Sequence, residues 1–331
     1  MTSFREMWDT AVSKPFAKFA WFLVAYTIFI IVWGAFVRAT GSGAGCGSHW
    51  PTCNGDIIHR PQQIETIIEM THRYTSMFLG FFSIAQIILA WRLFPQGHIM
   101  RKAVLVAFGF TVFEGLLGAG LVIFELVAYN TSSTRALVVG LHLVNTLLLL
   151  GAYVLVAWWA SGGSTFSLRQ NPRLTRMLGL AFAGLLLVSA FGAITALGNT
   201  LFPAGSLAEG IAQDFDPNSH FAVRLRVWHP VIAILTSVYL VVIMFNVDGL
   251  RQEGMARQLS NGLVAIIGLQ LVGGFLNVVL LAPVTMQLWH LITADVMWVL
   301  LICYTAVVLP QTAPAKSTEY ANKAILKPSG D

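Results

Sequence analysis

Charged residues are scarce in this chain. Only 11% of its 331 residues are Asp, Glu, Lys or Arg, whereas 56% are hydrophobic. A water-soluble surface needs charged residues at roughly a quarter to a third of its positions. The composition therefore excludes a soluble globular protein and predicts a polytopic membrane protein.

Eight apolar runs are long enough to cross a bilayer. The first run is a full span and lacks a convincing small-residue cleavage site, so we expect an uncleaved anchor rather than a signal peptide. The predicted fold class is an all-α membrane protein with eight transmembrane helices. The predicted spans are residues 19–37, 66–91, 103–124, 136–159, 177–197, 222–246, 259–281 and 284–309.

Acidic residues are fewer than basic ones, 15 against 20, and the pI is about 9.3. Most of the Lys and Arg lie in the N-terminal segment, in the loops after the second, fourth and sixth spans, and in the tail. Lys and Arg in short loops accumulate on the cytoplasmic side during insertion. We therefore predict that both termini are cytoplasmic, and this asymmetry explains the pI without a nucleic-acid partner.

Histidine is also uncommon, with eight residues in all, but four histidines lie inside predicted spans. His72, His142, His229 and His290 each lie roughly six to eight residues into an even-numbered span. At about 1.5 Å per helical residue, this places all four imidazoles about 10 Å below the outer surface. An intramembrane ionisable side chain is usually functional. The alternative, a hydrogen bond from each ring to a neighbouring helix, accounts poorly for four matched positions.

Short sequences recur in the two halves of the chain, which predicts two pseudo-symmetric four-helix bundles in the same orientation. The bundles are residues 19–160 and 177–309, joined by a cytoplasmic linker, 161–176, and flanked by cytoplasmic segments 1–18 and 310–331. Glycines in membrane helices also serve close packing, which is the alternative explanation. The recurring sequences are Gly34-Ala35 with Gly192-Ala193, Leu117-Gly118-Ala119 with Val272-Gly273-Gly274, and Leu141-His142-Leu143 with Trp289-His290-Leu291.

Two histidines on facing helices of one bundle are typical of axial ligation of a heme between them. Two bundles therefore predict two heme sites near the outer face. Because each ligand helix has only one histidine, stacked hemes that carry electrons across the membrane are disfavoured. A di-iron oxygenase needs a Glu-x-x-His pair on each of two helices. The chain offers only Glu69-Met70-Thr71-His72 and no clustered histidine boxes.

Glu69 distinguishes the N-terminal half. It precedes His72 by three residues, so the two side chains share a helix face. Arg226 occupies the corresponding place before His229. We therefore predict that chemistry occurs in the N-terminal half and that the C-terminal half holds a permanent cofactor. The alternative for Glu69 is a carboxylate at the interface within reach of water.

Cysteine is represented by three residues. Cys46 and Cys53 lie in the first outer loop, where an oxidising compartment favours a disulfide. A structural role and a redox role are both compatible with this pair. Cys303, near the inner end of the last span, is expected to pack as a small apolar residue.

Several of these segments together resemble heme A synthases, membrane enzymes that convert heme O to heme A for terminal oxidases. The segments are residues 34–43 (GAFVRATGSG), the loop from Cys46 to Cys53 with Trp50-Pro51, Glu69-Met-Thr-His72-Arg73, and the later histidines. The resemblance covers about residues 19–309. The chain departs from many members in carrying Ser48-His49 before Trp50, and it lacks a second cysteine pair between the fifth and sixth spans.

The resemblance implies oxidation of one porphyrin methyl of heme O to a formyl group through successive hydroxylations. It implies a heme b held by His229 and His290, and a catalytic, substrate-binding site at His72 and His142. Glu69 matches the functional glutamate of the family, and Cys46 with Cys53 match its disulfide. The implied setting is the cell membrane, with lipid, an electron donor and the farnesyltransferase that makes heme O as partners.

Arginines near the outer helix ends are candidates to pair with heme propionates, although interfacial arginines also reach lipid headgroups. Two other functions remain open from the sequence. One is a membrane heme carrier or chaperone, and the other is a quinone-linked diheme cytochrome, against which the shared depth of the histidines argues. The candidate arginines are Arg38, Arg73, Arg135, Arg224 and Arg226.

Overall fold

The computed structural model describes residues 4–56, 63–248 and 254–310. Eight helical segments are long and apolar enough to cross a membrane. The predicted all-α fold with eight spans is confirmed, and the chain is a multi-pass membrane protein. The predicted tail lies outside the described residues except for Pro310. The elements are α1 (Phe4–Ala39), η1 (Ser42–Ala44), α2 (Ile64–Leu93), α3 (Ile99–Ile123), α4 (Ser133–Ala160), α5 (Pro172–Leu201), α6 (Leu207–Phe215), α7 (Phe221–Arg224), η2 (Leu225–Val227), α8 (Trp228–Asp248), α9 (Met255–Val279) and α10 (Val284–Val308).

Several helices continue past the predicted apolar runs. Helix α1 begins at Phe4, within the predicted N-terminal segment, and α5 begins at Pro172, within the predicted linker. Asn171 caps α5 by accepting a hydrogen bond from Leu174 N, and proline is favourable in the first helical turn. The length of an apolar run indicates only the part of a helix that faces lipid or protein. The helices are longer than these runs because their polar terminal turns are also helical and are capped.

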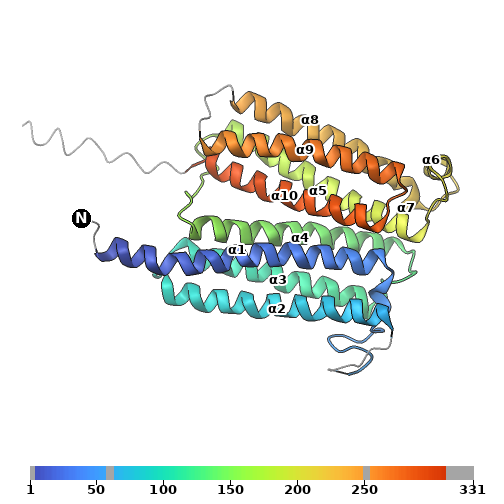
Figure 1. Ribbon diagram of the computed structural model, residues 1–331, viewed down its shortest axis with the longest axis horizontal. Helices are drawn as coiled ribbons and strands as arrows, with labels where there is room; N and C mark the ends of the chain where they lie inside the picture. Colours follow the sequence, from blue (N-terminus) through green and yellow to red (C-terminus); the bar gives the residue numbers. More distant parts are fainter. Residues whose placement is uncertain (1–3, 57–62, 249–253, 311–331) are drawn as a thin grey trace, which may run out of the picture.

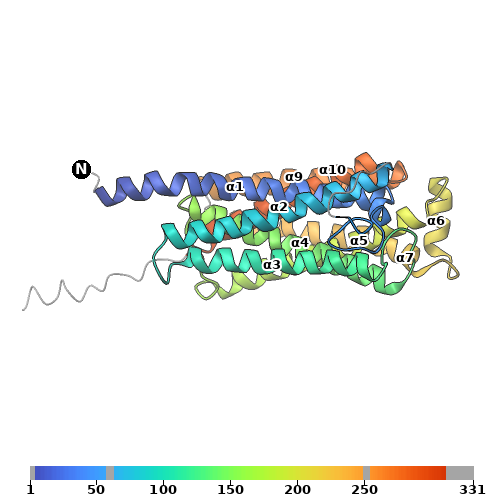
Figure 2. The ribbon, with the colours of Figure 1, turned by 90° about the horizontal axis from the view of Figure 1, so that it is seen from below.

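Helix α6, in the loop between α5 and α7, was not predicted. It is a nine-residue helix that Ser206 caps by accepting from Glu209 N, while the Glu209 carboxylate accepts from Gly205 N. Figure 2 shows α6 running across the end of the helical bundle. A search for long apolar runs misses a helix this short.

The first four spans form a closed four-helix bundle, in which α1 and α3 both pack on α2 and on α4. The last four form a row in which α5 packs on α8, α8 on α9 and α9 on α10. This row is closed by the first half, because both α5 and α10 pack on α4 (Figure 1). Helices α4 and α10 are therefore central, with 50% and 56% of their most apolar stretches buried.

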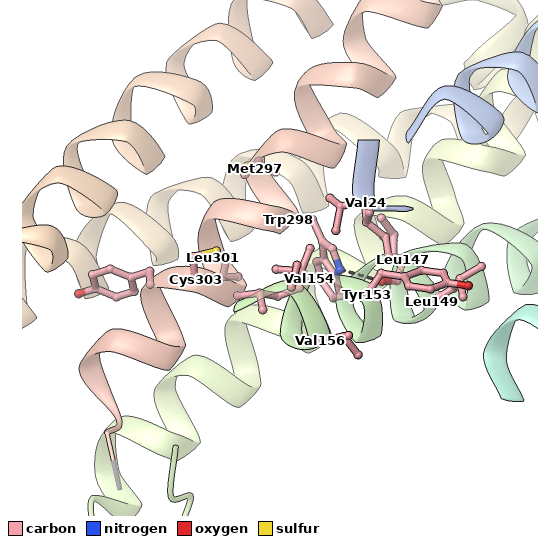
Figure 3. Close-up of a cluster of buried hydrophobic side chains, with 14 of the residues drawn as sticks. Val24, Leu147, Leu149, Tyr153, Val154, Val156, Met297, Trp298, Leu301 and Cys303 are labelled. Carbon is pink, nitrogen blue, oxygen red and sulfur yellow. Dashed lines mark hydrogen bonds between the residues drawn. The ribbon is translucent and has the colours of Figure 1, made fainter. Parts of the chain in front are cut away.

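The contact between α4 and α10 is apolar and close (Figure 3). Trp298 Nε1 donates to the Leu147 carbonyl at 2.7 Å. Gly151 permits the close approach, because a Cβ at that position would stand 3.3 Å from Trp298 Nε1 and 3.1 Å from Ile302 Cδ1. Buried side chains from both halves form one continuous cluster. The two predicted bundles therefore share a core.

The connections that precede α2, α4, α8 and α10 all lie at one end of the molecule, together with α6 and α7 (Figures 1 and 2). Helix α1 begins and α10 ends at the opposite end. The four helices that carry the intramembrane histidines therefore run in the same direction, and each histidine lies near the first end of its span.

Candidate functional site

Each intramembrane histidine lies against a glycine of the preceding span. A Cβ placed on Gly34 or on Gly192 would stand 3.0 Å from Cε1 of the facing histidine ring. Glycine thus leaves room for an imidazole directly against the helix backbone. These are the glycines that recur in the two halves of the sequence. The pairs are Gly34 with His72, Gly118 with His142, Gly192 with His229, and Gly273 and Gly274 with His290.

The helices that carry each histidine pair are not close neighbours. Within the described parts of the chain, α2 packs mainly on α1 and α3 rather than on α4, and α8 mainly on α5 and α9 rather than on α10. Each pair of imidazoles therefore projects from two separated helices toward a shared interior. Of the two predicted pairs, the structure brings the rings of His229 and His290 close together. The pairing of His72 with His142 stays a prediction.

The distance between the rings of His229 and His290 leaves room for one metal atom between them. Their ring centroids are 6.3 Å apart and the rings are nearly perpendicular, at 84°. Two metal–nitrogen bonds of about 2 Å each, plus the distance from each nitrogen to its ring centre, give about 6 Å. His229 Nδ1 lies 3.1 Å from the Val188 carbonyl. A contact of that kind usually orients a ligating histidine and leaves Nε2 for the metal. These residues fit a heme iron between them.

His142 has a carboxylate neighbour that the sequence analysis missed. Its Nδ1 lies 3.3 Å from Oε1 of Glu114 on α3. Asn145 Nδ2 donates to the other oxygen of Glu114 at 2.7 Å, and the Thr146 hydroxyl donates to Oε1. The available signal was an acidic residue inside the third predicted span, because charges at that depth are usually functional.

Glu69 is buried, with 3% of its surface exposed. One carboxylate oxygen accepts from the backbone N–H of Cys46 at 2.8 Å. The other accepts from Arg73 Nε at 3.1 Å and also from Nη2. Arg73 in turn donates from Nη1 to the carbonyls of His49 and Thr52, at 2.6 and 2.7 Å. Glu69 and Arg73 therefore fasten the loop between α1 and α2 to α2, one turn from His72.

The loop between α1 and α2 is also closed covalently. Cys46 and Cys53 form a disulfide, as predicted. Thr66 at the start of α2 donates its hydroxyl hydrogen to the Gly45 carbonyl at 2.7 Å, which adds a second attachment beside the disulfide. Cys303 is buried and unbonded, as expected for a small packing residue.

Arg38 joins the two halves of the molecule. From α1, its Nη1 donates to the Ala196 carbonyl and the Thr200 hydroxyl of α5, at 2.7 and 2.8 Å. Its Nη2 donates to Gln287 Oε1 on α10 at 2.8 Å. These bonds use both terminal nitrogens of the guanidinium, so the side chain serves as a link between spans.

Two further candidate arginines also hold loops at the same end. Arg135 donates to the carbonyls of Ala128 and Asn130 in the connection between α3 and α4. Arg226 connects α6 with α5, through an ion pair and an amide contact to α6 and an amide contact to α5. Arg224 is exposed, and its side chain makes no hydrogen bond or ion pair among the described residues. The Arg226 partners are Asp214 at 2.8 Å, Asn199 at 3.0 Å and Gln213 at 3.1 Å.

Comparison with known proteins identifies the family of the chain. Residues 17–302 match the COX15-CtaA family, described as cytochrome oxidase assembly protein. The chain is 42% identical over 97 residues to heme A synthase of Halalkalibacterium halodurans, covering 29% of this chain and 33% of that protein. It is 43% identical over 100 residues to heme A synthase of Alkalihalophilus pseudofirmus, covering 29% and 33%.

A longer match connects the chain with a protein of Thermus thermophilus named protoheme IX farnesyltransferase. The identity is 44% over 315 residues, which is 95% of this chain and 52% of that protein. The chain thus spans about half the length of this relative. Because the family match covers most of the chain, it belongs to the COX15-CtaA family of cytochrome oxidase assembly proteins, in agreement with its resemblance to heme A synthases.

Proposed function

We propose that the chain is a heme A synthase, with a heme b between His229 and His290 and a substrate heme O between His72 and His142. The observation that carries this proposal is the pairing of His229 with His290, 6.3 Å apart between ring centroids, with Nδ1 of His229 held by a backbone carbonyl. The membership of the family and the similarity to proteins named heme A synthase supply the reaction.

The assignment of the two sites follows from their charges. Glu114 contacts His142, and Glu69 lies within one turn of His72. His229 is oriented instead by the neutral carbonyl of Val188. We infer that the charged N-terminal site performs the oxidation and that the C-terminal site keeps its heme. When bound there, heme b would supply one-electron transfer between the substrate site and an external electron partner.

The reaction replaces a porphyrin methyl by a formyl group. Each hydroxylation converts one C–H bond to C–OH. The oxygen atom comes either from water, with release of two electrons and two protons to an external acceptor, or from dioxygen, with uptake of two electrons and two protons and release of one water. The geminal diol formed by the second hydroxylation loses water to give the aldehyde. The side chains of this chain hold the substrate and its surroundings in place. His72 and His142 orient the porphyrin, and the Glu69–Arg73 pair fixes the disulfide loop beside it. Glu69 is thereby a positioning group, while a role in accepting a proton stays a prediction.

We place the heme sites near the outer face of the cell membrane, with both termini in the cytoplasm. Support comes from the basic residues at the end where α1 begins, and from the disulfide at the other end. The repeated glycine and histidine contacts support two pseudo-symmetric halves, 19–160 and 177–309. Glycine positions and chain direction recur, although only the first half closes on itself.

Heme analysis tests the proposed function directly. The full chain is expressed in cells that supply heme O, and extracted hemes are identified by mass spectrometry and pyridine hemochrome spectra. Intact protein is expected to yield heme A or its hydroxylated intermediate, whereas His72→Ala and His229→Ala are expected to yield neither. If only unmodified heme were recovered with the intact protein and with both variants, the proposed synthase function would be wrong and a heme carrier would be the better interpretation.

Farnesyl transfer is a second candidate, because a relative bears that name. We assign that activity to the part of the relative that this chain does not match, since other relatives are named heme A synthase. Purified chain incubated with heme B and farnesyl diphosphate is therefore expected to form no heme O. Formation of heme O would reverse the assignment. A separate farnesyltransferase would then be unnecessary as the source of substrate.

A further inference from the structure

Glu114 is held in a defined position between α3 and α4. Asn145 donates to one oxygen at 2.7 Å, and the Thr146 hydroxyl contacts the other. Asn145 also donates to the Phe110 carbonyl of α3 at 3.1 Å, so its amide is itself fixed. The same carboxylate oxygen that meets Thr146 lies 3.3 Å from His142 Nδ1. The cluster thus holds a carboxylate close to one nitrogen of a predicted ligand, and that buried nitrogen has no hydrogen-bond partner.

The second half has a neutral group at the corresponding place. Gln270 precedes Gly274 by four residues, as Glu114 precedes Gly118. Its Oε1 accepts from the hydroxyl of Thr293 at 2.5 Å, and Thr293 follows His290 by three residues, as Asn145 follows His142. The two sites therefore share a polar contact between the glycine helix and the histidine helix, but only the N-terminal site has a carboxylate there.

We propose that Glu114 is the positioning residue of the N-terminal heme site. Its carboxylate lies 3.3 Å from His142 Nδ1 without a hydrogen bond in this structure; when heme is bound, it accepts the Nδ1–H of His142 and directs Nε2 of that ring toward the substrate iron. This inference rests on the N-terminal heme site of the proposed function. Carboxylate partners orient ligating histidines and make them stronger electron donors to the metal. The substrate iron would accordingly have a lower reduction potential than an iron whose histidine contacts only neutral groups.

The test uses the purified full chain loaded with heme B as the probe. Reduction potentials are measured by spectroelectrochemical titration, and the heme that His72→Ala removes is assigned to the N-terminal site. Glu114→Gln preserves the side-chain shape and removes the charge. It is expected to raise the potential of the N-terminal heme and to weaken its binding about 10- to 100-fold. The C-terminal heme is expected to keep its potential and its spectrum, which also reports that the variant is folded.

Two variants complete the experiment. Glu114→Asp keeps the charge but moves the carboxylate oxygen away from His142. The reduction potential of the N-terminal heme is therefore expected to rise, but less than in Glu114→Gln. This variant supplies a second measurement if Glu114→Gln does not fold. Gln270→Glu is the matched control and is expected to leave the N-terminal potential unchanged. No shift in either Glu114 variant, or equal shifts at both hemes, would overturn the inference. Heme A formation is measured separately, so failure of the synthase activity would leave this result interpretable.

Discussion

Each of the four histidine rings faces a glycine, and the approach is closest at Gly34 and Gly192, where a Cβ would crowd the ring. Both Gly34 and Gly192 have a ring carbon of histidine 3.0 Å from the position of a Cβ, closer than such carbons normally approach. The ring therefore packs against the bare backbone of the neighbouring helix. This contact limits the rotation of the imidazole before any ligand binds.

Gly192→Ala tests whether this contact supports heme binding. The added methyl forces the His229 ring to move, and overpacking of this kind costs about 1–3 kcal/mol. We expect heme b affinity to fall about ten-fold or more in a heme titration of the purified protein. Gly179→Ala, on the same helix with no atom within 4 Å of its Cβ, is the control. Equal heme binding by the two variants would show that the glycine contact is unimportant.

The buried Glu69 carboxylate gives a second test at this scale. Its hydrogen bond with the Cys46 amide is a bond to a charged group, worth about 1.5–3 kcal/mol. Glu69→Leu is therefore expected to increase hydrogen exchange of the Cys46 amide about ten-fold or more, measured by mass spectrometry. Glu65→Gln, an exposed change one turn earlier, should leave that exchange unaltered. If the Cys46 amide exchanged at the same rate in Glu69→Leu as in the wild type, Glu69 would not contribute to the attachment of the loop.

The sequence predicted some of these residues better than others. His72, His142, His229 and His290 were recognisable because rare ionisable residues recur at one depth. Glu114 was missed because its partners lie on another helix, more than a full span away in sequence. Only packing of α3 on α4 reveals that its carboxylate meets His142. Pairs within one helix, such as Glu69 and His72, are visible from spacing alone.

At the scale of helices and loops, arginines add polar links between elements that also pack on one another or on the loops beside them. Arg38 bridges α1 to α5 and α10, Arg73 holds the loop between α1 and α2, Arg135 holds the connection between α3 and α4, and Arg226 holds α6. These contacts all lie at the end where the histidine helices begin. The sequence analysis placed the arginines at that end, and their pairing with propionates stays a prediction.

Arg38→Gln is expected to loosen the junction between α1 and the C-terminal half. The change removes charge-assisted bonds to three acceptors and should lower the stability by about 2 kcal/mol or more. Thermal unfolding in detergent measures the effect. Arg224→Gln, an exposed arginine without a described partner, should unfold at the wild-type temperature. A wild-type midpoint for Arg38→Gln would indicate that lipid or water replaces these bonds.

The helices themselves were largely predictable, because each span is an unbroken apolar run. Their ends were less predictable, since α5 continues to its Asn171 cap and α6 is too short to produce such a run. The arrangement of the second half was not predictable either. Helices α5 and α10 are both apolar, and apolarity alone does not indicate that each packs on α4. Topology of this kind depends on side-chain shape at the contacts.

Considered as a whole, the molecule has one continuous apolar core to which both halves contribute. The row α5, α8, α9 and α10 is completed by α4, and the apolar core continues from one half into the other. A duplicated architecture does not therefore imply independent halves. Any change at the α4–α10 contact should reach both heme sites.

Gly151→Leu tests this cooperativity. The leucine side chain would meet Trp298 and Ile302 of α10, and overpacking should lower the stability by about 1–3 kcal/mol. Because the halves share a core, the temperatures at which the two hemes are released should fall together, as measured by absorbance during heating. Gly109→Leu, on α3 with open space around its Cβ, should leave both temperatures unchanged. If only one heme were released earlier in Gly151→Leu, the halves would unfold independently, and the asymmetric closure through α4 would not couple the two sites.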